Sequence, residues 1–215
     1  MNIIVQKYGG TSTRSTQSRQ RMYQNIIRNI ELGNKVVAVV SAMGRYDDPY
    51  ATDTLASLVD LDYLTGEESD RLLSIGETIS AILIKSELSK MGYRVATVSN
   101  SELGIFTDHC YENANIIDVD GKHILNKLID VDIVICPGFQ GRNKDNKITT
   151  LGRGGSDLSA IAIGVAVNAF EVEIYSDVNG IYTADPRIVP DAIKLDYISS
   201  VSYTHLRAHE TAANL

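Results

Sequence analysis

Five short runs of apolar, mostly β-branched residues recur along the chain, and they constrain its fold more than any other feature. Such runs are typical of strands in a sheet covered on both faces. Helical patterns separate them: residues 15–32 place Met22, Ile26, Ile27 and Ile30 on one stripe. Strands that alternate with helices predict an α/β sandwich with a largely parallel central sheet. The five runs are residues 2–6, 35–40, 93–98, 131–136 and 171–175.

Several residues mark where the predicted helices begin and end. Gly33 is a plausible end for the first helix, and Gly92 for a later one. Thr65, with Glu68 three residues later, has the form of a capping box that opens a helix, and Gly76 is expected to interrupt that helix.

The length and polar stretches of the chain favour one large domain. With 215 residues, 44% of them hydrophobic, the chain is long enough to bury a substantial core. The polar stretch of residues 140–150 is flanked by strand formers and predicts a hairpin rather than a domain linker.

Charge and cysteine content exclude several classes of protein. Twenty basic and 27 acidic side chains leave a net charge of −7, which argues against a general nucleic-acid or anionic-membrane surface. There is no apolar stretch of membrane-spanning length, and the first residues lack a signal-peptide pattern. The two cysteines, Cys110 and Cys136, do not suggest a disulfide framework. We expect a soluble, cytoplasmic protein.

A strand followed by two glycines opens the chain. In residues 7–12, Lys-Tyr-Gly-Gly-Thr-Ser, the turn can aim backbone N–H groups and a helix start at phosphate oxygens, and Lys7 adds a full positive charge. The standard P-loop pattern is absent. Taken alone, an ordinary tight turn with a solvated lysine explains this segment equally well.

A second glycine-rich segment, residues 151–157, strengthens the phosphate hypothesis. Arg153 lies among three glycines and can grip a carboxylate with two hydrogen bonds. Ser156 can cap the apolar helix predicted over residues 158–167, and Asp157 falls in its first turn. Helix capping alone would explain Ser156 and Asp157. Two glycine turns that each carry a cation into a helix start are harder to explain by loop chemistry.

A third segment, residues 176–187, follows the last predicted strand. Asn179-Gly180 and Asp185-Pro186 are turn signals, and Arg187 supplies a cation. These features are structural by themselves. In an open α/β sheet, however, ligands bind beyond the carboxyl ends of the strands, which is where this segment falls.

These three segments, in this order, resemble the aspartokinases of the amino acid kinase family, and the likeness runs from residue 2 to about residue 199. Further matches are Val39-Val40-Ser41-Ala42-Met43, Ser74-Ile75-Gly76-Glu77 and Gly138-Phe139-Gln140-Gly141. The resemblance implies a three-layer αβα sandwich and a homodimer. It also implies transfer of the γ-phosphoryl group of MgATP to the side-chain carboxylate of L-aspartate. The product, 4-phospho-L-aspartate, would begin lysine, threonine and methionine biosynthesis.

The resemblance also implies roles for individual residues. Lys7 and Asp157 would be catalytic: Lys7 neutralises the transferring phosphoryl group, and Asp157 orients Lys7. ATP would contact Lys7, Gly9, Gly10, Ser176, Asp177, Tyr182 and Arg187. The acceptor L-aspartate would contact Thr11, Ser41, Glu77, Phe139, Arg153, Gly155 and Ser156.

Electrostatics supports this division of roles, although two of the residues have simpler explanations. Glu77 would meet the ammonium of aspartate and Arg153 a carboxylate. Without the resemblance, Glu77 would be interpreted as a solvated helix carboxylate and Phe139 as a core aromatic. Mg²⁺ would arrive mainly with ATP phosphates and water, so no protein ligand for the metal is predicted. His205 and His209 are four residues apart, which is weak evidence for zinc.

The last sixteen residues depart from the family pattern. Residues 1–199 are interpreted as an incomplete kinase domain, and residues 200–215 as a non-matching tail, hypothesised to be a foreign or misread end. A later family lysine and the carboxyl-terminal regulatory domains have no counterpart. An alternative function is therefore a catalytically weak nucleotide-binding or assembly module of the same fold. Kinases of this fold that act on glutamate, acetylglutamate, carbamate or uridylate are the nearest enzyme alternatives.

Overall fold

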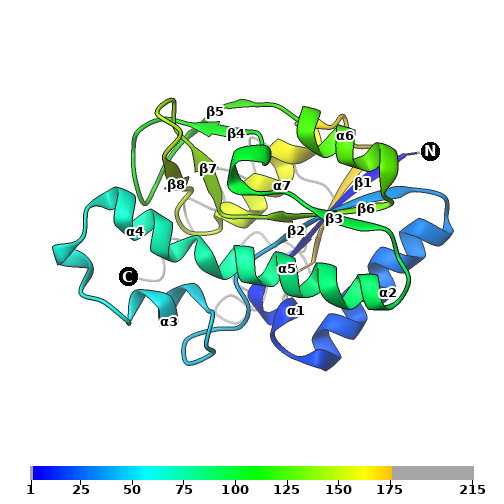
Figure 1. The fold of residues 1–215 in the computed structure, drawn as a ribbon, viewed down its shortest axis with the longest axis horizontal. Helices are drawn as coiled ribbons and strands as arrows, with labels where there is room; N and C mark the ends of the chain where they lie inside the picture. Colours follow the sequence, from blue (N-terminus) through cyan, green and yellow to red (C-terminus); the bar gives the residue numbers. More distant parts are fainter. Residues whose placement is uncertain (1, 176–215) are drawn as a thin grey trace, which may run out of the picture. The chain divides into compact units, whose positions relative to one another are not determined.

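The computed structural model describes residues 2–175, which belong to the first of two units into which the chain divides (Met1–Ser176). Their centre is a five-stranded sheet in the order β3-β6-β2-β1-β9, and each neighbouring pair is parallel (Figure 1). All five predicted runs form these strands, so the predicted α/β fold is confirmed. The strands are β1 (Ile3–Tyr8), β2 (Lys35–Val40), β3 (Val95–Thr97), β6 (Ile133–Pro137) and β9 (Glu171–Tyr175).

Helices cover both faces of this sheet, because successive strand residues point to opposite sides. On one face, Val36, Ala38 and Val40 pack with residues of α2 (Thr16–Glu31) and α5 (Ile75–Lys90). On the other, Val37 and Val39 pack with α6 and α7. The sheet is therefore the middle of three layers, and β2 is buried along its whole length. The helices of the second face are α6 (Lys122–Asp130) and α7 (Gly155–Ala166).

A second, smaller sheet has the order β5-β4-β7-β8. Its strands β7 (Gln140–Arg142) and β8 (Ile148–Thr150) are antiparallel, with Gln140 opposite Thr150, which confirms the predicted hairpin. The sequence did not predict β4 (Ile105–Thr107) or β5 (Ile116–Val119), whose runs are too short to show a period. The remaining elements are α1 (Gly10–Arg14), α3 (Thr52–Ala56), η1 (Leu61–Tyr63), α4 (Gly66–Leu73) and η2 (Asn100–Glu102).

The predicted helix ends are mostly correct. Gly33 and Gly92 follow α2 and α5 with φ of +80° and +92°, and Thr65 and Glu68 form the capping box of α4. The predicted position of the break between α4 and α5, at Gly76, is wrong, because the break lies at Ser74.

Gly76, expected to interrupt the helix, lies inside α5 instead. A Cβ at this position would come within 2.6 Å of the Tyr50 carbonyl oxygen and 2.7 Å of the Ala42 Cβ. This glycine therefore allows α5 to approach the loop that follows β2.

Other sequence predictions can be compared with the same residues. Cys110 is exposed and Cys136 buried, and both are free thiols, as expected. Among residues 2–175, no helix combines the length and apolar character that crossing a bilayer requires. Predictions about residues 176–215, including the non-matching tail and the pair His205 and His209, lie outside the described residues.

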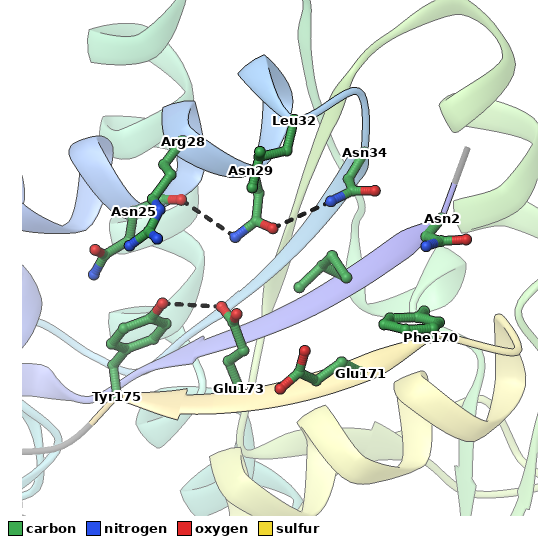
Figure 2. Close-up of a pocket in the computed structure, with 11 residues that line it drawn as sticks. Asn2, Asn25, Arg28, Asn29, Leu32, Asn34, Phe170, Glu171, Glu173 and Tyr175 are labelled. Carbon is green, nitrogen blue, oxygen red and sulfur yellow. Dashed lines mark hydrogen bonds between the residues drawn. The ribbon is translucent and has the colours of Figure 1, made fainter.

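A pocket lies between α2 and β9, on the α2 face of the sheet (Figure 2). Arg28 and Asn29 of α2 face Glu171 and Glu173 of β9 across it, and Phe170 lies at one end. Of the described residues, none that is predicted to bind ATP or aspartate lines this pocket.

Candidate active site

The parallel register brings three loops to one edge of the central sheet. Tyr8, near the end of β1, lies opposite Val40 of β2, and Val40 lies opposite Pro137 of β6. The segments that follow these strands therefore leave the sheet side by side. They are residues 9–12, 41–44 and 138–139, and all three contain predicted site residues. Ligands of open α/β sheets bind at this edge.

The two predicted catalytic residues contact each other here. Lys7 is 8% exposed, and its Nζ lies 2.7 Å from Oδ1 of Asp157. Asp157 is in the first turn of α7, where the helix dipole favours a negative charge. The lysine is not solvated, so the structure excludes an ordinary turn with a freely hydrated cation. The ion pair holds an ammonium group beside the glycine turn.

The glycine turn packs closely against the loop after β2. Gly9 precedes α1 as its N-cap residue, and Thr11 lies half-buried within this five-residue helix. The Gly44 N–H donates to the Gly10 carbonyl at 3.0 Å. A Cβ on Gly10 would lie 2.5 Å from the Gly44 oxygen and 2.7 Å from the Ala42 oxygen, so a glycine is needed here. Gly44 is not among the predicted site residues, although it follows the predicted strand of residues 35–40 in the way that Gly9 and Gly10 follow the first one.

Glu77 is a buried carboxylate aimed at the same loop. It is 2% exposed, and its Oε1 accepts a hydrogen bond from the Ala42 N–H at 3.0 Å. Its Oε2 is buried and has no hydrogen-bond partner among the described residues. Burial raises the pKa of Glu77 to about 7. The interpretation of Glu77 as a solvated carboxylate is therefore wrong, and one of its oxygens is available to a cationic group.

Ser41 and Phe139 lie in the segments that follow β2 and β6. Ser41 is half-buried and its N–H donates to the Tyr8 carbonyl at 3.0 Å. Phe139 is also half-buried and has a φ of +69°, which is strained for a residue with a side chain. The Ser159 hydroxyl accepts from the Phe139 N–H at 3.0 Å and holds this conformation. Phe139 is not a fully buried core aromatic.

The start of α7 packs against the loop after β6. A Cβ on Gly138 would lie 2.9 Å from the Ser156 Cβ, and one on Gly155 would lie 3.1 Å from the Phe139 ring. Ser156 is buried, but it does not cap α7: the N-cap is Gly154, with a left-handed φ of +67° and no side-chain cap. The predicted capping role of Ser156 is therefore wrong, because a left-handed glycine already starts the helix.

Arg153 differs from the other predicted site residues. Its side chain is exposed, and no ion pair involves it among the described residues. It precedes the left-handed Gly154, so it lies in the turn that leads into α7. The structure thus gathers Lys7, Gly9, Gly10, Ser41, Glu77, Phe139, Gly155, Ser156 and Asp157 at one edge and leaves Arg153 at the surface.

The predicted nucleotide residues Ser176, Asp177, Tyr182 and Arg187 lie outside the described residues. The strand that leads to them, β9, pairs with β1 up to Tyr175. The Tyr175 and Tyr8 rings stack with centroids 4.8 Å apart and planes 7° from parallel. Within residues 2–175, there is no group of three or more His, Cys, Asp or Glu side chains placed to hold a metal ion.

Comparison with known proteins identifies the family. The family model described as "Amino acid kinase family" matches residues 2–214. The chain belongs to the amino acid kinase family. Within this family it is similar to Aspartokinase 1 of Bacillus subtilis, with 43% identity over 208 residues that cover 96% of this chain and 51% of the relative. Aspartokinase of Helicobacter pylori is 41% identical over 92% of this chain and 48% of its own. The chain spans about half the length of these relatives.

Solved structures of amino acid kinases show the same fold. The aspartate kinase from Synechocystis has 36% identity and a TM-score of 0.72, covering 89% of this chain and 31% of that one. E. coli aspartokinase III, solved with aspartate and ADP, has a TM-score of 0.75 over 90% of this chain and 53% of its own. At 23% identity, that second likeness shows the fold alone.

Proposed function

We propose that this chain transfers the γ-phosphoryl group of ATP to the side-chain carboxylate of L-aspartate, which gives 4-phospho-L-aspartate and ADP. The observation that carries the proposal is the ion pair between the buried Lys7 and the partly buried Asp157 at 2.7 Å, beside a glycine turn at the carboxyl edge of the sheet. The identity of 43% to a protein named Aspartokinase 1 supports the choice of acceptor.

Charge stabilisation is the main task of the phosphoryl side of this site. An oxygen of the acceptor carboxylate attacks the γ-phosphorus, and the bond to the bridging oxygen of ADP breaks, so the leaving group takes the electron pair. Lys7 would neutralise charge on the transferring group, and the backbone at Gly9 and Gly10 would approach its oxygens closely. Asp157 would keep the Lys7 ammonium in place, because their ion pair is sheltered from water.

The acceptor side would use the buried Glu77. An ammonium group bound at its free Oε2 would compensate a carboxylate that is otherwise costly to ionise at 2% exposure. Arg153 would close over a carboxylate of the substrate from the surface, with both of its terminal nitrogens. Thr11, Ser41, Phe139, Gly155 and Ser156 would form the rest of the acceptor pocket.

The nucleotide would be bound with Mg²⁺, which supplies additional charge neutralisation on the phosphates. Among the described residues, the carboxylate that contacts Lys7 is that of Asp157. Because the described residues offer no cluster of carboxylates for a metal ion, ATP phosphates and water would supply most metal ligands. Ser176, Asp177, Tyr182 and Arg187 remain the proposed contacts to the ribose, base and phosphates.

The wider setting follows from the same proposal. Phosphorylation of aspartate would place the chain at the start of lysine, threonine and methionine biosynthesis, including the diaminopimelate branch, in the cytoplasm. We also propose a homodimer. The interpretation of residues 1–199 as an incomplete kinase domain and of residues 200–215 as a non-matching tail stays a prediction.

A coupled ADP-release assay tests the function directly. The purified chain is given MgATP with L-aspartate, and separately with glutamate, acetylglutamate, carbamate or uridylate. We expect ADP release that depends on L-aspartate. Calorimetric titration with MgATP separates the alternatives: binding without turnover on any acceptor would replace the kinase proposal with a nucleotide-binding module. Turnover on another acceptor would change the substrate.

A further inference from the structure

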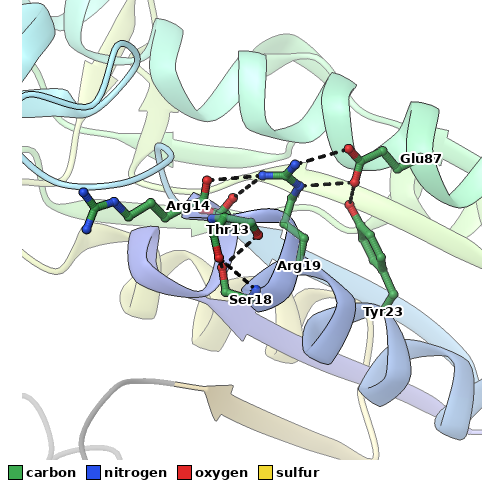
Figure 3. A network of polar contacts seen from close by, with 7 residues as sticks. Thr13, Arg14, Ser18, Arg19, Tyr23 and Glu87 are labelled. Carbon is green, nitrogen blue, oxygen red and sulfur yellow. Dashed lines mark hydrogen bonds and ion pairs between the residues drawn. The ribbon is translucent and has the colours of Figure 1, made fainter.

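Arg19, in the first part of α2, joins three elements through one guanidinium group (Figure 3). Its terminal nitrogen NH1 donates to the carbonyls of Thr13 at 3.0 Å and Arg14 at 3.3 Å. Its Nε and NH2 face the carboxylate of Glu87 in α5, at 3.2 and 3.4 Å. The arginine side chain is 11% exposed, so water weakens these contacts less than it would at an open surface.

The two carbonyls that Arg19 binds belong to the end of α1. This helix has only five residues, and its N-cap Gly9 offers no side-chain hydrogen bond. A helix this short is not stable by itself, because few internal hydrogen bonds offset the cost of ordering it. Its terminal carbonyls also lack partners within the helix. Arg19 supplies hydrogen-bond partners for these carbonyls. The helix that it contacts begins at Gly10, in the glycine turn.

The other end of the network is Glu87 in α5, the helix that also carries Glu77. Tyr23 donates its hydroxyl to the same Glu87 oxygen that Arg19 contacts, and Figure 3 shows both side chains converging on this carboxylate. Glu87 and Glu77 are both in α5, ten residues apart, or about 15 Å along the helix axis. Arg19 therefore connects the helix of the glycine turn to the helix of the buried Glu77.

We propose that Arg19 is a positioning residue that sets the glycine turn at residues 9–12 against α5, and so fixes the distance between the phosphoryl and acceptor halves of the site. Its effect on turnover rests on the proposed kinase function, whereas its effect on α1 does not. It touches no residue predicted to bind ATP or aspartate among the contacts that the structure shows. Positioning of reacting groups is sensitive, since an error of about 1 Å can cost roughly a hundredfold in rate.

The test compares Arg19→Ala with a matched arginine at the opposite edge of the sheet. Arg94 holds Asp132 with two hydrogen bonds, at 3.0 and 2.8 Å, and donates to the Asp130 carbonyl at 3.1 Å. It immediately precedes β3, at the amino ends of the strands. Arg94→Ala therefore removes a two-bond carboxylate contact and one carbonyl contact far from the glycine turn, at a side chain that is 64% exposed. Arg19→Lys keeps the charge but loses the forked geometry.

Two measurements are made on each variant: hydrogen exchange at the amides of residues 10–14, and kcat and KM for L-aspartate. For Arg19→Ala we expect exchange to be faster by about tenfold or more, and kcat to fall roughly 10- to 100-fold with a smaller change in KM. Arg19→Lys should restore part of both. Arg94→Ala should lower the melting temperature and leave exchange in α1 and kcat unchanged.

The other possible outcomes also test the proposal that Arg19 positions the glycine turn. Unchanged exchange in α1 of Arg19→Ala would overturn the proposal, and so would an equal loss of kcat and α1 protection in Arg94→Ala. If Arg19→Ala does not fold, Glu87→Gln weakens the same anchor with a smaller change and is measured in its place. If the wild-type chain shows no turnover, the kinase proposal fails, and the exchange experiment alone decides whether Arg19 holds the glycine turn.

Discussion

At the scale of single residues, two buried lysines lie at opposite edges of the sheet and contact different partners. Lys7 and Lys35 are each 8% exposed. Lys7, near the carboxyl end of β1, contacts Asp157. Lys35, at the amino end of β2, donates to the carbonyls of Leu128 and Val131. Equal burial therefore does not distinguish the two lysines, but Lys7 lies at the edge of the sheet where ligands of open α/β sheets bind.

This pair of lysines provides a matched test of the phosphoryl site. We expect Lys7→Met to lower kcat for phosphoryl transfer by orders of magnitude, because a charge at the transferring group is lost. Lys35→Met makes the same change in side-chain volume at the other edge of the sheet. It should lower the melting temperature and leave kcat near the wild-type value. Steady-state kinetics and thermal unfolding of both variants are the measurements. A wild-type kcat in Lys7→Met would contradict the role of this lysine.

The raised pKa of Glu77 predicts how aspartate binding depends on pH. Burial raises this pKa to about 7, so the carboxylate is largely protonated at pH 6 and ionised at pH 8. Only the ionised form attracts an ammonium group. KM for L-aspartate should therefore fall as pH rises from 6 to 8, and Glu77→Gln should raise KM and remove this dependence. The same pH profile in Glu77→Gln as in the wild type would exclude Glu77 as the titrating group.

As pH rises, the free energy of unfolding should fall, whereas the affinity for L-aspartate should rise. Because the folded chain holds the Glu77 proton more tightly than the unfolded chain, this residue contributes less to the free energy of unfolding as pH rises from its ordinary pKa to about 7. Glu77→Gln should therefore gain stability relative to the wild type between pH 5 and pH 8, as measured by urea unfolding.

At the scale of elements, the loops at the carboxyl edge pack against one another through backbone contacts at glycines. The Gly10 carbonyl accepts from the Gly44 N–H, and Gly76 lets α5 approach Ala42. The Ala42 N–H in turn binds Glu77. The first glycine turn, the loop after β2 and the start of α5 therefore form one packed group. Movement of any one of them would displace the others.

The two adjacent glycines of the first turn should respond differently to alanine. A Cβ on Gly10 would meet two carbonyl oxygens at 2.5 and 2.7 Å, whereas a Cβ on Gly9 would meet only the Lys7 Nζ, at an ordinary 3.5 Å. We expect Gly10→Ala to cost about 1–3 kcal/mol in the free energy of unfolding and to reduce kcat. Gly9→Ala should stay close to wild-type stability. Urea unfolding of both variants checks this, and equal losses would show that close packing at Gly10 is not the cause.

At the scale of the described unit, a buried carboxylate joins α4 to the second sheet. Asp70 of α4 is fully buried and accepts hydrogen bonds from the Glu112 N–H and from both the N–H and the hydroxyl of Thr150. Burial raises the pKa of Asp70. Thr150 ends β8, just before the turn that carries Arg153. The carboxylate therefore ties that turn to α4.

Loss of this carboxylate should destabilise the whole unit. Asp70→Ala leaves three donors without their acceptor, and the two from Thr150 are buried, so we expect a loss of roughly 3 kcal/mol in the free energy of unfolding. Asp130→Ala, at an exposed position, is the control and should stay within about 0.5 kcal/mol of the wild type. Thermal and urea unfolding measure both. A loss no larger in Asp70→Ala than in Asp130→Ala would show that these hydrogen bonds contribute little net stability.

The sequence by itself determined the central sheet and most of the candidate site. Five apolar, mostly β-branched runs became five parallel strands, because such runs are typical of strands covered on both faces, although β9 at the end of the sheet is only partly buried. The glycine segments could be recognised because backbone that approaches a ligand closely needs residues without a side chain.

The tertiary structure alone decided which charges lie together. Lys7 and Asp157 are 150 positions apart in the sequence, and Arg19 and Glu87 are 68 apart. No local pattern reports such pairs, because the register of the sheet and the packing of helices across it create them. For the same reason, burial converted Glu77 from an apparently solvated carboxylate into one with a free oxygen and a raised pKa. Local periodicity specifies elements, whereas desolvation and ion pairing depend on residues that meet only after folding.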